Sequence, residues 1–190
     1  MATVAQNFEQ THPRVIESKL RPAPVPEQYA ARPRLERLIA RLIDRQRVIL
    51  VTAAAGSGKT TAVAAALRRS KRPAAWLTVD RPDQAAGRLI TYLEASLERQ
   101  RGTSLDVASS ALAAGIPHAE AAGLLAESIG SATDQPVVIV LDELERLAEA
   151  ADAWNVVEAV LRYAPTGTCL ILISRRDIPS RLCRLPSPAA

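Results

Sequence analysis

Apolar side chains gather in four short, continuous runs along the chain, and each run is bounded by polar residues, glycine or proline. A continuous apolar run of this length is typical of a strand that is buried on both faces of a parallel sheet. We therefore predict four strands, at residues 47–52, 74–79, 137–141 and 168–174.

Between these runs, apolar residues recur at the i, i+3, i+4 spacing of amphipathic helices. Helices are predicted at residues 32–46, 61–69, 82–101, 104–114, 118–129 and 154–163. Asp152 is a predicted N-cap for the last of them. Strands that alternate with helices predict an α/β fold, in which helices cover both faces of a parallel sheet through right-handed crossovers.

A glycine-rich loop joins the first predicted strand to its helix, and this order of strand, loop and helix is the context of a phosphate-binding loop. We expect backbone N–H groups of the loop to surround phosphates at the positive end of the helix, with Lys59 reaching the β- and γ-phosphates and Thr60 ligating Mg²⁺. Ala53 stands where the motif usually has its first glycine. Alanine can replace glycine at a position whose φ stays negative. The alternative is a glycine-rich turn without a ligand. The predicted nucleotide-binding residues of the loop are Ala55, Gly56, Ser57, Gly58, Lys59, Thr60 and Thr61.

Two carboxylates, Asp142 and Glu143, end the third apolar run. The carboxyl ends of parallel strands face the crevice in which α/β folds bind ligands. Asp142 is predicted to hold Mg²⁺ through water together with Thr60, and Glu143 to polarise an attacking water. The alternative is that both acids only cap a helix that starts near Glu143.

Two arginines follow the fourth apolar run. Arg175 or Arg176 is placed to sense a γ-phosphate and to stabilise charge in the transition state, and we assign Arg175 to catalysis and Arg176 to nucleotide binding. The alternative is that both are solvated loop residues or pair locally with Asp177.

These segments occur in an order that resembles the ATP-binding domain of large MalT/LuxR-type transcriptional regulators, which belong to the STAND class of signal-transduction ATPases. The resemblance spans about residues 17–180. The segments that carry it are residues 19–26, 32–35, the phosphate loop, 75–80, 141–143 and 174–177.

The resemblance implies a P-loop NTPase three-layer fold, with the fourth strand between the first and third, and an ATP-dependent switch that controls self-association and transcription. It also implies that Arg32 packs on the nucleotide from its N-terminal side. Ala54, Ser57 and Glu143 depart from the residues frequent in that family, and the last departure leaves open whether Glu143 is a base or a γ-phosphate contact. We expect the fifth strand, the helical lid and the winged, sensor and DNA-reading domains of the resembled proteins to be missing.

Length and composition agree with one α/β domain of 190 residues. We expect a polar N-terminal tail and Pro-rich arm at 1–31, with disorder to residue 17, a nucleotide-binding domain at 32–180, and a C-terminal tail at 181–190. No apolar run is long enough for a membrane span and the N-terminus lacks a signal-peptide core, so a cytoplasmic protein without membrane contact is predicted. Cys169 and Cys183 are predicted to be reduced thiols.

The net charge of +4 raises the question of nucleic acid binding. The basic residues are scattered, and the densest run, residues 68–72, follows a predicted helix, where cations suit the negative end of the dipole. Aromatic residues make up only 3% of the chain, too few for a base-stacking platform. We therefore predict no direct DNA-binding element in this chain.

Three functional hypotheses follow, each with ATP or ADP and Mg²⁺ as expected ligands in its active form. The first is a nucleotide-binding regulatory module, the second a working ATPase with slow turnover, and the third an inactive remnant. With no fifth strand, residues 47–52 should form a sheet edge, which favours self-association or cover by further domains.

Overall fold

The computed structural model describes residues 15–25, 30–131, 136–180 and 182. The expectations for the tail to residue 14, for positions 26–29, for Cys183 and for the end of the C-terminal tail lie outside the described residues.

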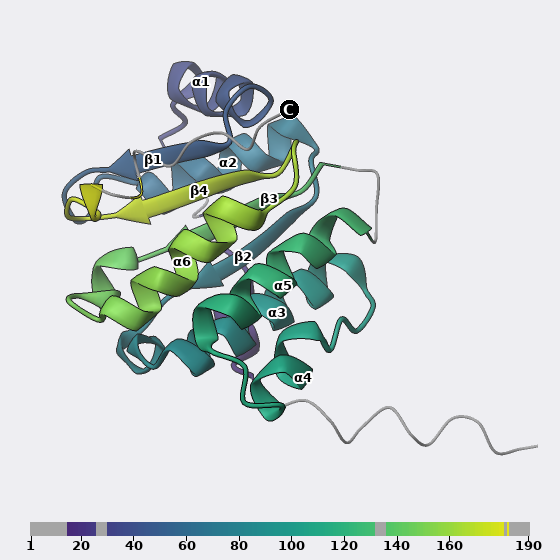
Figure 1. The fold of residues 1–190 in the computed structure, drawn as a ribbon. Helices are drawn as coiled ribbons and strands as arrows, with labels where there is room; N and C mark the ends of the chain where they lie inside the picture. The colour runs from purple at the N-terminus through teal and green to yellow at the C-terminus, as the bar shows by residue number, and fades with distance from the viewer. Residues whose placement is uncertain (1–14, 26–29, 132–135, 181, 183–190) are drawn as a thin grey trace, which may run out of the picture.

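The centre of the fold is a parallel sheet of four described strands, β1 (Val48–Thr52), β2 (Ala74–Thr78), β3 (Val138–Asp142) and β4 (Cys169–Ser174), shown in Figure 1. Their order across the sheet is β1-β4-β3-β2. The predicted place of the fourth strand between the first and the third is confirmed, and each predicted strand agrees with an observed one to within a residue at either end.

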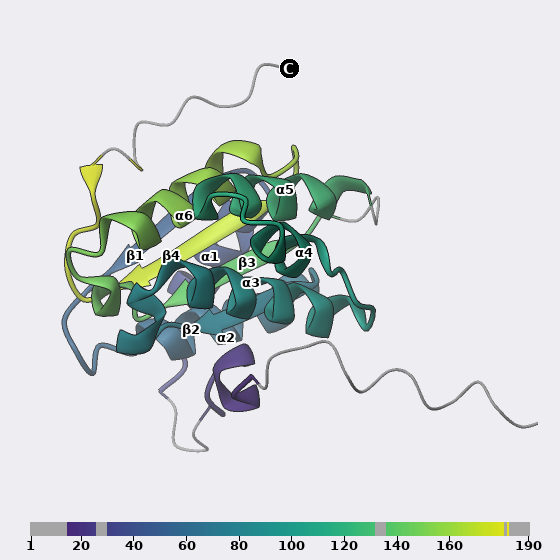
Figure 2. The ribbon, with the colours of Figure 1, turned by 60° about the horizontal axis from the view of Figure 1, so that its bottom comes forward.

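Helices cover both faces of this sheet, which makes three layers (Figures 1 and 2). One face packs against α1 (Pro33–Ile43) and α2 (Lys59–Ser70). The opposite face packs against α3 (Ala86–Arg101), α5 (His118–Ser131) and α6 (Ala151–Tyr163), while α4 (Val107–Ala113) lies against α3 and α5. The side chains of a strand alternate between the two cores, so that Val140 faces α2 and its neighbours Ile139 and Leu141 face α6. The predicted α/β three-layer architecture is therefore confirmed.

Several helix boundaries differ from the predictions because local contacts intervene. The predicted helix at 82–101 is split into a 3-10 turn, η2 (Arg81–Gln84), and α3, since the Asp83 carboxylate accepts the N–H of Asp80 at 2.8 Å and closes a separate turn. The predicted helix at 32–46 ends at Ile43. Asp152 is not an N-cap, because α6 begins at Ala151 and Asp152 lies in its first turn.

A short segment before the domain packs on it, which the sequence did not lead us to expect. Residues 17–20 form a 3-10 turn, η1 (Glu17–Leu20), in which Lys19 and Leu20 are buried beside β2 and α3. The N–H of Ile16 donates to the Tyr92 hydroxyl at 3.1 Å. The prediction of disorder is therefore wrong for residues 15–17, because apolar contacts and a buried cation hold this segment in place.

The β1 strand forms one edge of the described sheet, as predicted, since β4 is the strand that it pairs with. Val48 and Leu50 are 37% and 41% exposed, although both are large aliphatic residues. Their side chains point to the face of the sheet that packs against α3, α5 and α6, at the β1 edge of that face, which these helices leave uncovered. This edge leaves apolar and hydrogen-bonding groups of β1 open to other segments.

Candidate nucleotide site

A pocket of about 280 Å³ lies where the carboxyl ends of β3 and β4 meet the N-terminus of α2. Parallel α/β sheets bind ligands at this end of their strands. The predicted site residues that line it are Gly56, Gly58, Lys59, Thr60, Thr61, Asp142, Glu143 and Arg175.

The loop before α2 has the backbone of an anion cradle. Gly56 and Gly58 have φ values of +72° and +80°, which side-chain-bearing residues rarely adopt, and no atom lies within 4 Å of where their Cβ atoms would be. Gly58 is the N-cap of α2, and no side chain caps the helix. The first N–H groups of α2 therefore point into the pocket without intrahelical acceptors, at the positive end of the helix. The Ser57 hydroxyl is also buried without a partner in the described structure. Open space and unmet donors fit a bound phosphate chain.

The Lys59 ammonium group is engaged by the loop itself. Its Nζ donates to the carbonyl oxygens of Ala53 at 2.6 Å and Ala54 at 2.9 Å. The side chain thus lies along its own loop, and it must turn away from these two carbonyls to reach a phosphate.

Thr60 and Asp142 come together across 82 positions of the sequence. The Thr60 hydroxyl donates to Asp142 Oδ2 at 2.8 Å. Burial raises the pKa of Asp142, while the bonds from Thr60 and from the Glu143 N–H oppose this rise. A hydroxyl beside a buried carboxylate supplies the hard oxygen ligands that Mg²⁺ prefers, so this pair fits the predicted metal role. Bound Mg²⁺ would supply positive charge for the phosphates and for Asp142.

Glu143 sits in a strained backbone conformation and is held by two arginines. Its φ of +59° is unusual for a residue with a side chain, and such strain costs about 1–3 kcal/mol. Its carboxylate accepts Arg146 Nε at 3.0 Å and Arg175 Nη2 at 3.4 Å. A residue that must polarise water needs a free carboxylate oxygen, so these contacts would have to loosen before Glu143 could act as a base.

Arg175 links Glu143 to Glu145, a pocket residue that sequence reasoning missed. Its Nε lies 3.1 Å from Glu145 Oε1, and its backbone N–H donates to Glu145 Oε2 at 3.0 Å. The alternative of local pairing with Asp177 is not observed for Arg175 among the described residues. Nothing in the spacing singled out Glu145, because only the turn η3 (Leu144–Leu147) brings it back toward β4.

Four predicted residues, Arg32, Ala55, Ser57 and Arg176, do not line this pocket. Arg176 lines a neighbouring cavity of about 560 Å³, beside Trp154. Arg32 precedes α1 with an exposed side chain, and its N–H donates to Glu36 at 2.9 Å. Ala55 is exposed on the loop, outside the pocket lining. Their roles in nucleotide binding remain predictions.

Cys169 lies in the core strand β4, as predicted, and burial raises its pKa to about 12. A thiol with such a pKa is not a nucleophile at neutral pH. None of the helices within the described residues has the length and apolarity that crossing a bilayer requires.

Comparison with known proteins agrees with this geometry. Residues 30–173 match the family described as AAA ATPase domain, a span that contains the phosphate loop, Asp142 and all four described strands except the last residue of β4. No curated protein matches the chain.

Proposed function

Since the chain belongs to the AAA ATPase domain family, we propose that it is a nucleotide-dependent switch, the ATP- and ADP-binding regulatory module of a MalT/LuxR-type transcriptional regulator. The observation that carries this proposal is that both cationic side chains lining the pocket, Lys59 and Arg175, are bonded to acceptors of the protein itself. Lys59 is bonded to the carbonyls of Ala53 and Ala54, and Arg175 is paired with Glu143 and Glu145.

Both cations have protein acceptors that compete with a ligand. A nucleotide phosphate chain offers Lys59 a negatively charged acceptor in place of two neutral carbonyls, so the exchange adds the attraction between opposite charges. The same ligand draws Arg175 away from the two acids and so frees the turn η3 that carries Glu145. Nucleotide binding and a rearrangement of this turn are then linked, which is what a switch requires.

Thr60, Asp142 and the uncapped N-terminus of α2 hold the Mg-nucleotide in this proposal. Arg32 and Arg176 close over it from the N-terminal side and from the end of β4. The sequence order of residues 19–26, 32–35, 75–80 and 174–177 supports the specific assignment to the MalT/LuxR type. Nucleotide-controlled self-association, or cover by further domains, is the proposed output in the cytoplasm.

A working ATPase is the second candidate, and the position of Glu143 directly after Asp142 in the pocket favours it. We rank it below the switch because both oxygens of the Glu143 carboxylate are engaged by arginines. The third candidate, an inactive remnant, is disfavoured by the open cradle around Gly56 and Gly58.

The test is a titration with MgATP and MgADP by calorimetry, followed by a phosphate-release assay. Lys59→Ala should weaken binding of both nucleotides at least about tenfold, because it removes the loop's own cation. Arg68→Ala, an exposed change in the same helix, is the matched control and should bind like the wild type.

Three results separate the candidates. Binding with phosphate release far below about 1 s⁻¹ supports the switch. Turnover within about 1–100 s⁻¹ that Glu143→Gln abolishes would promote the ATPase. No binding by the wild type, or equal affinity in Lys59→Ala, would overturn the nucleotide assignment.

A further inference from the structure

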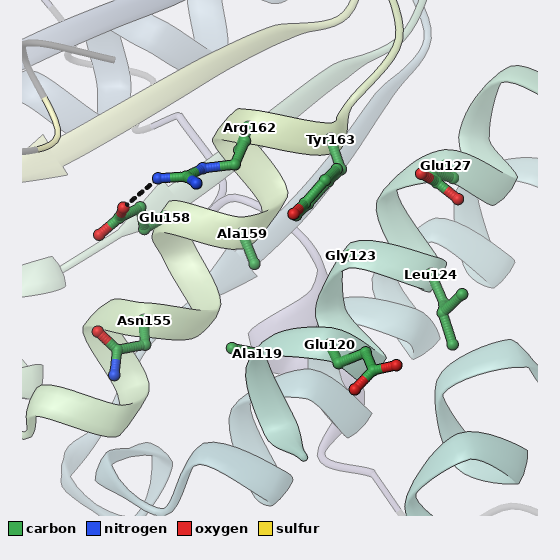
Figure 3. A pocket seen from close by; sticks show the side chains of 10 residues that line it. All are labelled: Ala119, Glu120, Gly123, Leu124, Glu127, Asn155, Glu158, Ala159, Arg162 and Tyr163. Atoms are coloured by element: carbon green, nitrogen blue, oxygen red, sulfur yellow. Dashed lines mark hydrogen bonds and ion pairs between the residues drawn. The ribbon is translucent and has the colours of Figure 1, made fainter. Parts of the chain in front are cut away.

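A groove of about 440 Å³ lies between α5 and α6, on the side of the molecule away from the sheet. Figure 3 shows Tyr163 reaching from α6 toward α5 beside Gly123, with acidic side chains on both helices. We call it the α5–α6 groove.

Small residues make the floor of the groove and larger apolar ones make its walls. Ala119, Gly123 and Ala159 line the floor. A Cβ at Gly123 would lie 3.0 Å from the Tyr163 ring, so the absence of a side chain there lets the ring lie against α5. Leu124 and Tyr163 are 38% and 47% exposed. These two walls present apolar surface to solvent next to each other across the groove.

The rim of the groove is acidic. Glu120, Glu127 and Glu158 line it, against one basic residue, Arg162, which pairs with Glu158 at 2.9 Å. An acidic rim on a chain with a net charge of +4 selects for a basic partner.

A surface of matching character occurs on α1. Arg34, Arg37 and Arg41 are exposed along one side of this helix and form no ion pair within the described part of the chain. Leu38 lies among them and is 44% exposed. A basic helix with a protruding leucine is the shape that an acidic, apolar groove between two helices accepts. We call these four residues the α1 basic face.

We propose that the α5–α6 groove binds the α1 basic face of a second copy of this chain. The two surfaces cannot meet within one molecule, because α1 and the α5–α6 pair belong to layers on opposite sides of the sheet (Figure 1). The contact joins two different surfaces, so it is head-to-tail and can continue into a ring or a filament. This inference names a surface for the self-association proposed above, and it rests on that proposal.

The contact also lies close to the nucleotide loop in one of its partners. α1 packs on α2, the helix that starts at the phosphate loop, and Arg69 of α2 pairs with Glu36 of α1 at 2.9 Å. A helix that docks in a neighbouring groove is therefore held by the helix that receives the phosphates.

A charge-swap experiment tests the proposal by sedimentation velocity over a micromolar concentration series. One variant reverses the face, Arg37→Glu with Arg41→Glu, and the other reverses the groove, Glu120→Lys with Glu127→Lys. All four positions are exposed, so the folds should be intact. Each variant alone should associate at least about tenfold more weakly than the wild type, because like charges then face each other. An equimolar mixture of the two variants should regain association.

Matched controls reverse charges elsewhere: Arg68→Glu with Arg81→Glu, and Glu149→Lys with Asp152→Lys, all at exposed positions. They should associate like the wild type. A monomeric wild type, undiminished association of either reversed variant, or a mixture that stays monomeric would each overturn the proposal.

Nucleotide affinity is measured on the same samples by calorimetry. Nucleotide binding should be retained in the groove variant, whose substitutions lie in the layer opposite the phosphate loop. Failure of wild-type binding would overturn the proposed switch, whereas failure of the charge swap with intact nucleotide binding would overturn only the surface named here.

Discussion

Lys19→Met should strongly destabilise the protein, because Lys19 is the buried counter-ion of an acid with no exposure at all. Its Nζ lies 2.5 Å from Asp83 Oδ2 and 3.0 Å from Asp80 Oδ1, and 4.0 Å from the centre of the Tyr92 ring. Methionine keeps most of the apolar stem and removes only the charge. The substitution therefore isolates the electrostatic contribution from the packing.

The magnitude follows from what remains around Asp83. Breaking a buried ion pair costs about 3–5 kcal/mol when the remaining charge is uncompensated. In the variant Asp83 keeps Arg88 at 3.1 Å and the Asp80 N–H at 2.8 Å, so the cost of breaking the ion pair lies at or below the lower end of that range. The lost contact between the ammonium group and the Tyr92 ring adds about 0.5–1 kcal/mol. We expect a total of about 3 kcal/mol, which corresponds to a fall in Tm of about 6–12 °C for a chain of this size.

Urea denaturation followed by circular dichroism measures this loss. Arg21→Met, an exposed neighbour, should cost less than about 0.5 kcal/mol. In an Asp83→Asn background the cost of Lys19→Met should shrink, because the amide carries no charge to compensate. A loss no larger than that of Arg21→Met would refute the reasoning and show that the buried ion pair of Lys19 contributes little to stability.

The contact of Lys19 with Asp80 predicts that the effect of Lys19→Met on stability depends on pH. Burial raises the pKa of Asp80, but hydrogen bonds with Lys19 and Asp83 and the charges of Lys19 and Arg88 bring it below the ordinary value of 3.8. A lowered pKa contributes stability that is present above 3.8 and is lost as the pH falls further. The difference in stability between wild type and Lys19→Met should therefore narrow below about pH 3.8.

Three further predictions concern the pocket and the sheet edge. Because burial raises the pKa of Asp142, this group favours folding at low pH and loses that contribution as the pH rises through its folded pKa. Asp142→Asn should therefore raise the Tm of the metal-free protein at pH 7, raise it less near pH 4, and weaken Mg-nucleotide binding. A lower Tm of the variant at pH 7 would contradict this. Glu143→Gly should stabilise the protein by about 1 kcal/mol in urea denaturation by relieving the positive φ, with Glu143→Ala, which keeps the strain, as control; equal stability of the two variants would contradict it. Leu50→Lys should reduce aggregation measured by light scattering, since it places a charge on the open edge, and scattering unchanged from wild type would show that this edge is not the source.

Local sequence carried the fold class and most of the site. The strands were predictable because their apolar runs are buried by both helical layers, as in Ile139 and Val140, and such burial leaves no polar side to the pattern. The phosphate loop was predictable because its glycines, lysine and threonine act within a few residues of one another. The exposed edge at β1 was also predictable, because no segment of the sequence has the pattern of the fifth strand that the resembled proteins carry there.

Tertiary structure decided how distant residues meet. The pairing of Thr60 with Asp142 agrees with what separate motifs suggested, but the capture of Arg175 by Glu143 and Glu145 depends on a turn that spacing does not encode. Lys19 lies in a stretch that looks like a polar tail, and it is ordered by Asp83, 64 positions away. Helix starts moved for the same reason, as in the turn that Asp83 closes before α3. A sequence pattern reports which residues must be buried, whereas the partner that satisfies a buried charge is set only when the chain has folded.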